Sequence, residues 1–120
     1  MQVTGRVIKG EGKAGGYYGI PTANLRLPTP LTIDPGVYAG WTTLPSGEVL
    51  PSVICYGAGS DQHGLKFEVH LIGFAADLSE QMLSVEIKDL VSNLVAFRDG
   101  EQMHKKILDD VAKVKMLLHV

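Results

Sequence analysis

The stretch KFEVHLIGF, residues 66–74, carries the pattern that decides the fold of this chain. Apolar and polar side chains alternate in it, so Phe67, Val69 and Leu71 share one face while Glu68 lies on the other. A period of two residues predicts a β-strand with one face in a hydrophobic core. The opposite face is then turned toward solvent or a ligand.

The same alternation recurs along the chain between clusters of turn-forming residues. The 14 glycines and 6 prolines fall between short alternating segments, which is typical of all-β proteins. The predicted strands cover residues 3–9, 37–44, 49–56, 66–74 and 83–91. Leu44-Pro45-Ser46-Gly47 predicts a hairpin turn between two of them. Several short strands in a chain of 120 residues indicate a small β-barrel.

The last twenty residues change to a helical pattern, with apolar residues at spacings of 4, 4, 3 and 4. These residues are Met103, Ile107, Val111, Val114 and Leu118. Asp99 is the expected N-cap, and Gln102 completes a capping box. No change in composition marks a second domain. We therefore expect residues 1–120 to form one domain, in which the barrel closes against a C-terminal helix.

Composition excludes several classes of protein. Lys and Arg number 11 against 13 Asp and Glu, a net charge of −2, and no basic stripe is present to bind a nucleic-acid backbone. The one cysteine, Cys55, indicates a reducing compartment and excludes a structural zinc site. No apolar run reaches the ~18 residues that span a bilayer, and the first residues lack a signal-peptide core. We expect a cytoplasmic monomer with small-molecule partners and with neither nucleic-acid nor membrane partners.

A glycine-rich segment follows the first predicted strand, KGEGKAGGYYGIPTANL at residues 9–25. No helical pattern follows it, so it is neither a Walker A loop nor a dinucleotide-binding motif. Glycines let backbone amides approach an anion closely, and Lys13 adds a positive charge. The amides expected to surround phosphates belong to Gly10, Gly12, Gly15 and Gly16. The alternative is an ordinary surface loop, since loops are commonly rich in glycine.

The end of this segment, Pro21-Thr22-Ala23-Asn24, offers two oxygen ligands from one extended piece of chain. Pro21 fixes φ, and Thr22 and Asn24 then project a hydroxyl and an amide carbonyl. Mg²⁺ usually takes one or two protein oxygens in addition to phosphates and water. Thr22 and Asn24 are therefore candidate magnesium and nucleotide ligands. The alternative is a structural turn, in which Asn24 bonds its own backbone.

Glu68 is the candidate catalytic residue, because its carboxylate lies in mid-strand on the polar face with Lys66 and His70. In phosphoryl transfer one carboxylate accepts the proton of the attacking hydroxyl. The alternative is a solvated residue on the outward face of an antiparallel sheet. Cys55, within an apolar strand, is expected to be buried and inert.

Taken in order along the chain, these motifs resemble the riboflavin kinase (flavokinase) family. The family's glycine-rich loop and Gly-Ile-Pro-Thr-Ala-Asn motif are similar to residues 10–13 and 19–25. Its Gly-Val-Tyr and Glu-x-His strands are similar to residues 36–38 and 68–70. Its C-terminal helix pattern is similar to Phe97, Glu101, Met103, Ile107 and Asp110. The resemblance covers nearly the whole chain.

The resemblance implies a six-stranded antiparallel Greek-key-like β-barrel with a C-terminal α-helix. It also implies transfer of the γ-phosphoryl group of ATP to the ribityl 5′-hydroxyl of riboflavin, which gives FMN and ADP. Thr22 and Asn24 would hold Mg²⁺ against the nucleotide, residues 10–16 would cover the phosphates, and Glu68 would be the general base.

The flavin side departs from the family pattern. The family's Asn/Ser-Ile-Gly segment is similar only to Cys55-Tyr56-Gly57, and its Tyr-Gly turn is replaced by Ser79-Glu80. The Leu-Arg-x-Glu flap is replaced by Val91-Ser92-Asn93-Leu94, which lacks both charged residues. Two alternatives therefore stay open. One is a non-catalytic module that binds flavin or nucleotide, and the other is a kinase for a different small alcohol.

Overall fold

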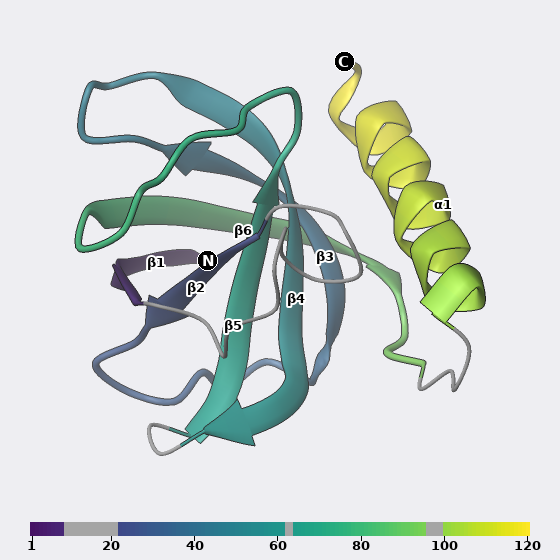
Figure 1. The fold of residues 1–120 in the computed structure, drawn as a ribbon, viewed down its shortest axis with the longest axis horizontal. Coiled ribbons are helices and arrows are strands. Elements are labelled where there is room, and N and C mark those ends of the chain that lie inside the picture. Colours follow the sequence, from purple (N-terminus) through teal and green to yellow (C-terminus); the bar gives the residue numbers. More distant parts are fainter. Residues whose placement is uncertain (9–21, 62–63, 96–99) are drawn as a thin grey trace.

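The computed structural model describes residues 1–8, 22–61, 64–95 and 100–120, and it contains six strands and one helix (Figure 1). Their bounds are β1 Gln2–Ile8, β2 Ala23–Arg26, β3 Gly36–Thr43, β4 Val49–Asp61, β5 Gly64–Leu71, β6 Met82–Ser92 and α1 Gly100–Leu118. No helix within these described ranges is long and apolar enough to cross a membrane. The expected β-barrel with a C-terminal helix is confirmed.

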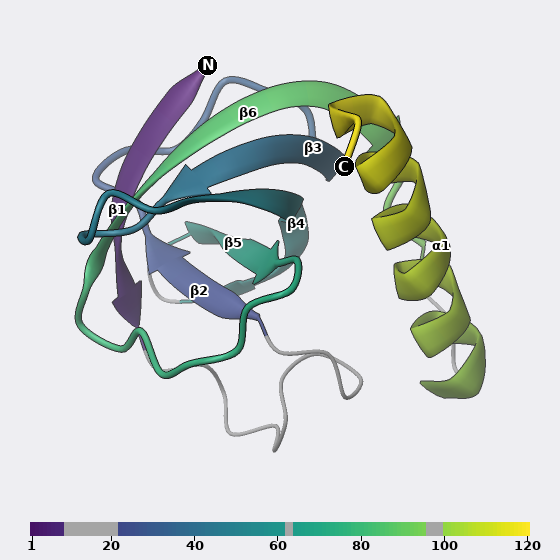
Figure 2. The same cartoon turned by 90° about the horizontal axis from the view of Figure 1, so that it is seen from above.

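The strands form a closed antiparallel barrel in the order β1-β2-β5-β4-β3-β6, with β6 paired back to β1 (Figure 2). Five of the strands correspond to the alternating segments of the sequence. The sixth, β2, has only four residues, which is too short for alternation to be recognised. It joins the barrel because it pairs with β1 on one side and β5 on the other.

The barrel interior is filled by the apolar faces that alternation predicted. Phe67, Val69 and Leu71 of β5 are at most 5% exposed and belong to one core cluster with Leu83 and Val85 of β6. The predicted inward face of residues 66–74 is therefore confirmed. Burial of these faces supplies the main driving force for closing the barrel.

The helix α1 packs against the outside of the barrel, where β3, β4 and β6 run side by side (Figure 2). Val114 of α1 is fully buried in a second, smaller cluster with Val37, Ala39 and Val53. Val111 and Leu118 pack at its edge, which confirms the helical stripe. Because one face of β3 meets the barrel interior and the other meets α1, residues 36–40 are all buried. The predicted N-cap, Asp99, lies outside the described residues.

Among the described residues, three glycines have a positive φ, which other residues rarely adopt, and two of them, Gly47 and Gly57, shape β4. Gly47 has φ of 92° and donates its amide hydrogen to the Leu44 carbonyl oxygen at 2.8 Å, which confirms the predicted turn between β3 and β4. Gly57 has φ of 94°, and a Cβ atom there would lie 2.6 Å from the Cβ of Pro35. The pairing of β4 with β5 shifts between Tyr56 and Ser60, so Gly57 begins an irregular stretch of β4.

Candidate functional site

The two residues expected to bind metal and to act as base, Asn24 and Glu68, lie directly opposite each other on β2 and β5. Directly paired residues project on the same face, with Cβ atoms about 4.5–5.5 Å apart. The pairing thus brings together an amide and a carboxylate that are far apart in the sequence. Thr22 precedes β2 by one residue and, like Asn24, is half-buried.

This pair belongs to a row of side chains that runs around the outside of the barrel. The strand registers place Ile8, Asn24, Glu68, Cys55, Val37 and Ser92 side by side in that order, on β1, β2, β5, β4, β3 and β6. The row faces outward, because Val37 packs beneath α1 whereas the flanking Phe67 and Val69 fill the interior. We refer to these six residues as the outer row.

Glu68 is 7% exposed although it lies on the outward face of the barrel. Its interpretation as a solvated strand residue is therefore wrong. Its neighbours in the outer row, Asn24 and Cys55, are half-buried, as are Lys66 and His70 on the same face of β5. A carboxylate that is held in place and largely withdrawn from water is suited to accept a proton from a bound hydroxyl.

Cys55 lies opposite Glu68 on the neighbouring strand and is a free, half-buried thiol. Burial, together with the negative charges of Glu68 and Asp110, raises the pKa of this thiol to about 12, while Lys106 acts in the opposite direction. The thiol therefore stays protonated at neutral pH and is a poor nucleophile. The expectation that Cys55 is inert is confirmed, although it is only half-buried.

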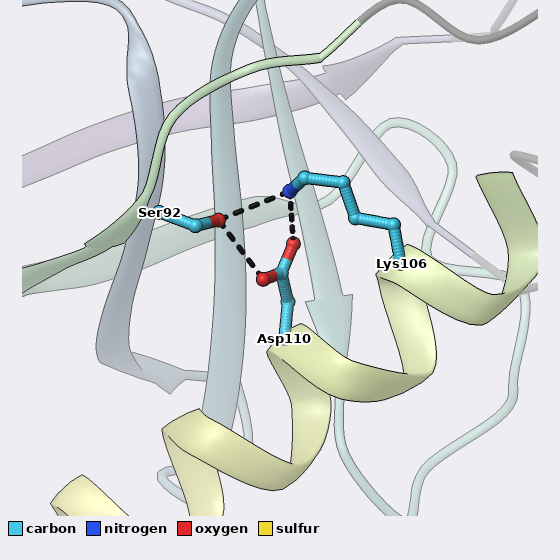
Figure 3. A network of polar contacts seen from close by, with 3 residues as sticks. All are labelled: Ser92, Lys106 and Asp110. Atoms are coloured by element: carbon cyan, nitrogen blue, oxygen red, sulfur yellow. Dashed lines mark hydrogen bonds and ion pairs between the residues drawn. The ribbon is translucent and has the colours of Figure 1, made fainter. Parts of the chain in front are cut away.

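A polar network links the end of β6 with α1 (Figure 3). The Ser92 hydroxyl donates to Asp110 Oδ1 at 2.9 Å, and Lys106 Nζ lies 2.6 Å from Asp110 Oδ2. Lys106 Nζ also donates to Ser92 Oγ at 3.0 Å, so the three side chains form a closed ring. The Lys106 and Asp110 side chains are only 17% and 5% exposed. We call this network the β6–α1 lock.

No sequence pattern identifies the β6–α1 lock as a unit. Asp110 matches the family's helix pattern, and Lys106 belongs to none of the motifs. The available signal was a Lys and an Asp four residues apart, with the Asp next to the apolar stripe of the helix. Ser92 supplies the third member from a strand, which helical spacing does not predict.

Residues 91–94, which stand where the family has its flap motif, form part of the contact with α1. Val91 and Leu94 pack at the edge of the cluster beneath the helix, Ser92 belongs to the β6–α1 lock, and Asn93 is exposed. The predicted phosphate-binding residues lie outside the described residues. They are Gly10, Gly12, Lys13, Gly15 and Gly16.

At a further departure from the family, Ser79-Glu80, the second residue adopts a backbone conformation that favours glycine. Glu80 has φ of 68°, and its amide hydrogen is donated to the Val7 carbonyl oxygen at 2.9 Å. The preceding turn is stabilised by Asp77, which accepts a hydrogen bond from the Ser79 amide at 2.9 Å. Hydrogen bonds from Ser79 lower the pKa of the Asp77 carboxyl group.

The few oxygen donors of the site suit a hard cation whose remaining ligands are phosphate and water oxygens. Among the described residues there is no group of three or more His, Cys, Asp or Glu that could hold a metal ion. Thr22 and Asn24 offer neutral oxygens, and Glu68 offers a carboxylate beside Asn24. Mg²⁺ accepts such a sparse protein set when phosphates and waters complete its shell.

Comparison with known proteins shows one family across the chain. A family model described as "Flavokinase: Riboflavin kinase" matches residues 1–118. The bifunctional riboflavin kinase/FMN adenylyltransferase of Haemophilus influenzae is 35% identical over 116 residues, which are 95% of this chain and 37% of that protein. The riboflavin kinase of Mus musculus is 29% identical over 121 residues, 95% of this chain and 78% of that protein. The chain thus spans less than two fifths of its bifunctional relative.

Two solved structures share the fold. A Streptococcus pneumoniae protein described as a macrolide-efflux protein superimposes with a TM-score of 0.82 at 22% identity, over 95% of this chain and 38% of that one. Riboflavin kinase from Trypanosoma brucei superimposes with a TM-score of 0.68 at 19% identity, over 98% of this chain and 79% of that one. At these identities the likeness concerns the barrel and its helix.

Proposed function

This chain belongs to the riboflavin kinase family, and from that premise we propose that it transfers the γ-phosphoryl group of ATP to the ribityl 5′-hydroxyl of riboflavin. The products are FMN and ADP. The observation that carries the proposal is the direct opposition of Asn24 and Glu68 across β2 and β5. It sets a buried carboxylate beside a neutral oxygen ligand, as phosphoryl transfer to an alcohol requires.

In the proposed reaction Glu68 is the general base. The 5′-hydroxyl oxygen of riboflavin forms a bond to the γ-phosphorus, and its proton passes to the Glu68 carboxylate. The bond from the γ-phosphorus to the bridging oxygen breaks, and its electron pair leaves with ADP. Support for this role comes from the low exposure of Glu68, 7%, on a face that points away from the core.

Thr22 and Asn24 are the proposed ligands of Mg²⁺ bound to the nucleotide. When present, the ion neutralises charge on the phosphates. The residues fit it because a hydroxyl and an amide carbonyl are hard oxygen donors, which Mg²⁺ prefers. The glycine-rich residues 10–16 would cover the phosphates with backbone amides, and Lys13 would add a positive charge.

We further propose that residues 1–120 act as one riboflavin kinase-like domain, monomeric and cytoplasmic. The family match over residues 1–118 supports a single domain. The one cysteine, Cys55, is free and protonated, as in proteins of reducing compartments.

A kinase for a different small alcohol is the second candidate, and one observation favours it. The segment at residues 91–94 lacks the flap's Arg and Glu, and Ser92 instead contacts α1. Competition between riboflavin and other alcohols for the phosphoryl group separates the two candidates. A non-catalytic binding module would be distinguished from both kinases because it binds ligands but forms no phosphorylated product.

The first experiment is FMN formation from riboflavin and MgATP by purified protein, with Glu68→Gln measured in parallel. Glutamine keeps the size of the side chain but cannot accept the proton, so we expect kcat to fall by roughly 10² to 10⁴ while ATP still binds. His70→Gln on the same face of β5 is the matched control and should have a much smaller effect. FMN formation that is equal in Glu68→Gln and wild type would remove Glu68 from the mechanism.

A further inference from the structure

The β6–α1 lock is a directional contact beside the apolar cluster beneath α1. Val37, Ala39 and Val53 of the barrel pack against Val114 of α1, and apolar packing alone leaves a helix free to slide or rotate slightly. The buried pair of Lys106 and Asp110, closed through Ser92, joins two successive turns of α1 to the last residue of β6 (Figure 3). Charge-assisted hydrogen bonds of this kind fix the relative position of α1 and β6 and also stabilise their contact.

The outer row shows on which side of Glu68 the lock lies. Asn24, the proposed nucleotide-side ligand, is the neighbour of Glu68 on one side, and Cys55 is its neighbour on the other. In an in-line transfer the leaving and attacking oxygens lie on opposite sides of the phosphorus. With the nucleotide on the Asn24 side, the attacking alcohol approaches from the Cys55 side, toward α1.

Cys55 connects the lock with the site. It is paired with Glu68 across β4 and β5, and it also packs at the edge of the cluster beneath α1. The charges of Glu68, Asp110 and Lys106 all act on its thiol. In the outer row Cys55 and Val37 separate Glu68 from Ser92, so the lock lies on the Cys55 side of the proposed base.

We propose that Lys106 and Asp110 are positioning residues for the acceptor alcohol: through Ser92 they hold α1 and the end of β6 at the acceptor side of Glu68, and so set the affinity for riboflavin. This inference rests on the proposed function and deepens it. The lock lies on the opposite side of Glu68 from Asn24, so its main effect is expected on riboflavin affinity rather than on nucleotide binding.

The test compares Lys106→Met with Lys106→Arg, Ser92→Ala and Lys105→Met in steady-state kinetics with riboflavin and MgATP. Lys106→Met keeps the apolar length of the side chain but removes the ion-pair partner of Asp110, whereas Lys106→Arg keeps the charge. Ser92→Ala opens the ring while keeping the ion pair, and so tests the lock even if Lys106→Met does not fold. Lys105→Met is the matched control, because it removes the same charge from an exposed neighbouring position.

We expect Lys106→Met to raise the KM for riboflavin roughly 10-fold to 100-fold, with kcat and the KM for ATP changed less than about threefold. Lys106→Arg should restore most of the affinity, Ser92→Ala should give a smaller increase in the same KM, and Lys105→Met should match wild type. An unchanged KM for riboflavin in folded Lys106→Met and Ser92→Ala, or an equal loss in kcat and both KM values, would overturn the inference. Wild-type protein that neither phosphorylates nor binds riboflavin would overturn the proposed function as well.

Discussion

At the scale of single residues, Glu80 occupies a backbone conformation that favours glycine. Its φ of 68° lies in the left-handed region, which costs most side chains about 1–2 kcal/mol. The Glu80 side chain adds little stabilisation to offset this cost. Its ion pair with Arg6 spans 4.0 Å between side chains that are 60% and 79% exposed, and such surface pairs contribute little to stability.

We therefore expect Glu80→Gly to raise the free energy of unfolding by about 0.5–1 kcal/mol. Relief of the strained φ exceeds the extra entropy that glycine gives to the unfolded chain. Urea unfolding of the variant and wild type measures the difference. Ser79→Gly, at a neighbouring position without a positive φ, should not stabilise the protein. A destabilised Glu80→Gly would mean that the Glu80 side chain contributes more than its exposure indicates.

The individual site residues show how far sequence reasoning reaches. Alternation was enough to place Glu68 on the outward face, because the period of two residues needs only local sequence. Its burial was not predictable in this way, since it depends on neighbours from other strands. Asn24 and Glu68 are each candidates for a role from sequence, but their direct opposition follows from the pairing of β2 with β5, which no local pattern encodes.

At the scale of elements, α1 buries three side chains, which are those of Met103, Asp110 and Val114. Val114 is 0% exposed and packs on Val37, Ala39 and Val53, whereas Met116, on another face of the helix, is 77% exposed. Val114 is therefore expected to contribute strongly to the docking of α1, and Met116 is not.

Val114→Ala should lower the free energy of unfolding by about 1–3 kcal/mol, because it removes two buried methyl groups and leaves a small cavity under the helix. Met116→Ala, which removes a larger but exposed side chain, should change it by less than about 0.5 kcal/mol. Urea unfolding followed by circular dichroism measures both. Equal effects of the two substitutions would contradict the docking of α1 through its Val114 face.

Elements with a clear period were predictable and the shortest element was not. The apolar stripe of α1 and the alternation in β5 and β6 extend over enough residues to identify each element from sequence alone. The four residues of β2 are identified as a strand only by their partners, β1 and β5. The β6–α1 lock joins two elements, so it too required the tertiary arrangement.

At the scale of the whole molecule, ligand binding to the closed barrel is expected to appear as stabilisation. A ligand that binds only the folded state at about 100 times its Kd adds about 2.7 kcal/mol to the free energy of unfolding. MgATP should therefore raise the melting temperature. Removal of Mg²⁺ with EDTA should abolish most of this increase, because phosphates bound without the ion would lose the proposed link to Thr22 and Asn24.

Thermal melts with MgATP, with ATP plus EDTA, and with riboflavin alone test this expectation in wild type and in Thr22→Ala. The variant should lose most of the MgATP-dependent increase and keep the response to riboflavin. An identical MgATP response in Thr22→Ala and wild type would remove Thr22 from the proposed metal site. Loss of the riboflavin response without Mg²⁺ would assign Thr22 to the flavin side instead.

The order of strands in the barrel has a consequence for synthesis of the protein. The first strand, β1, is closed by the last, β6, and β2 meets its second partner only when β5 has been made. A nascent chain that has not yet delivered β6 leaves β1 and β3 with unpaired edges, which invite aggregation. Loss of the residues from Met82 onward is therefore expected to prevent closure of the barrel and to leave aggregation-prone strand edges.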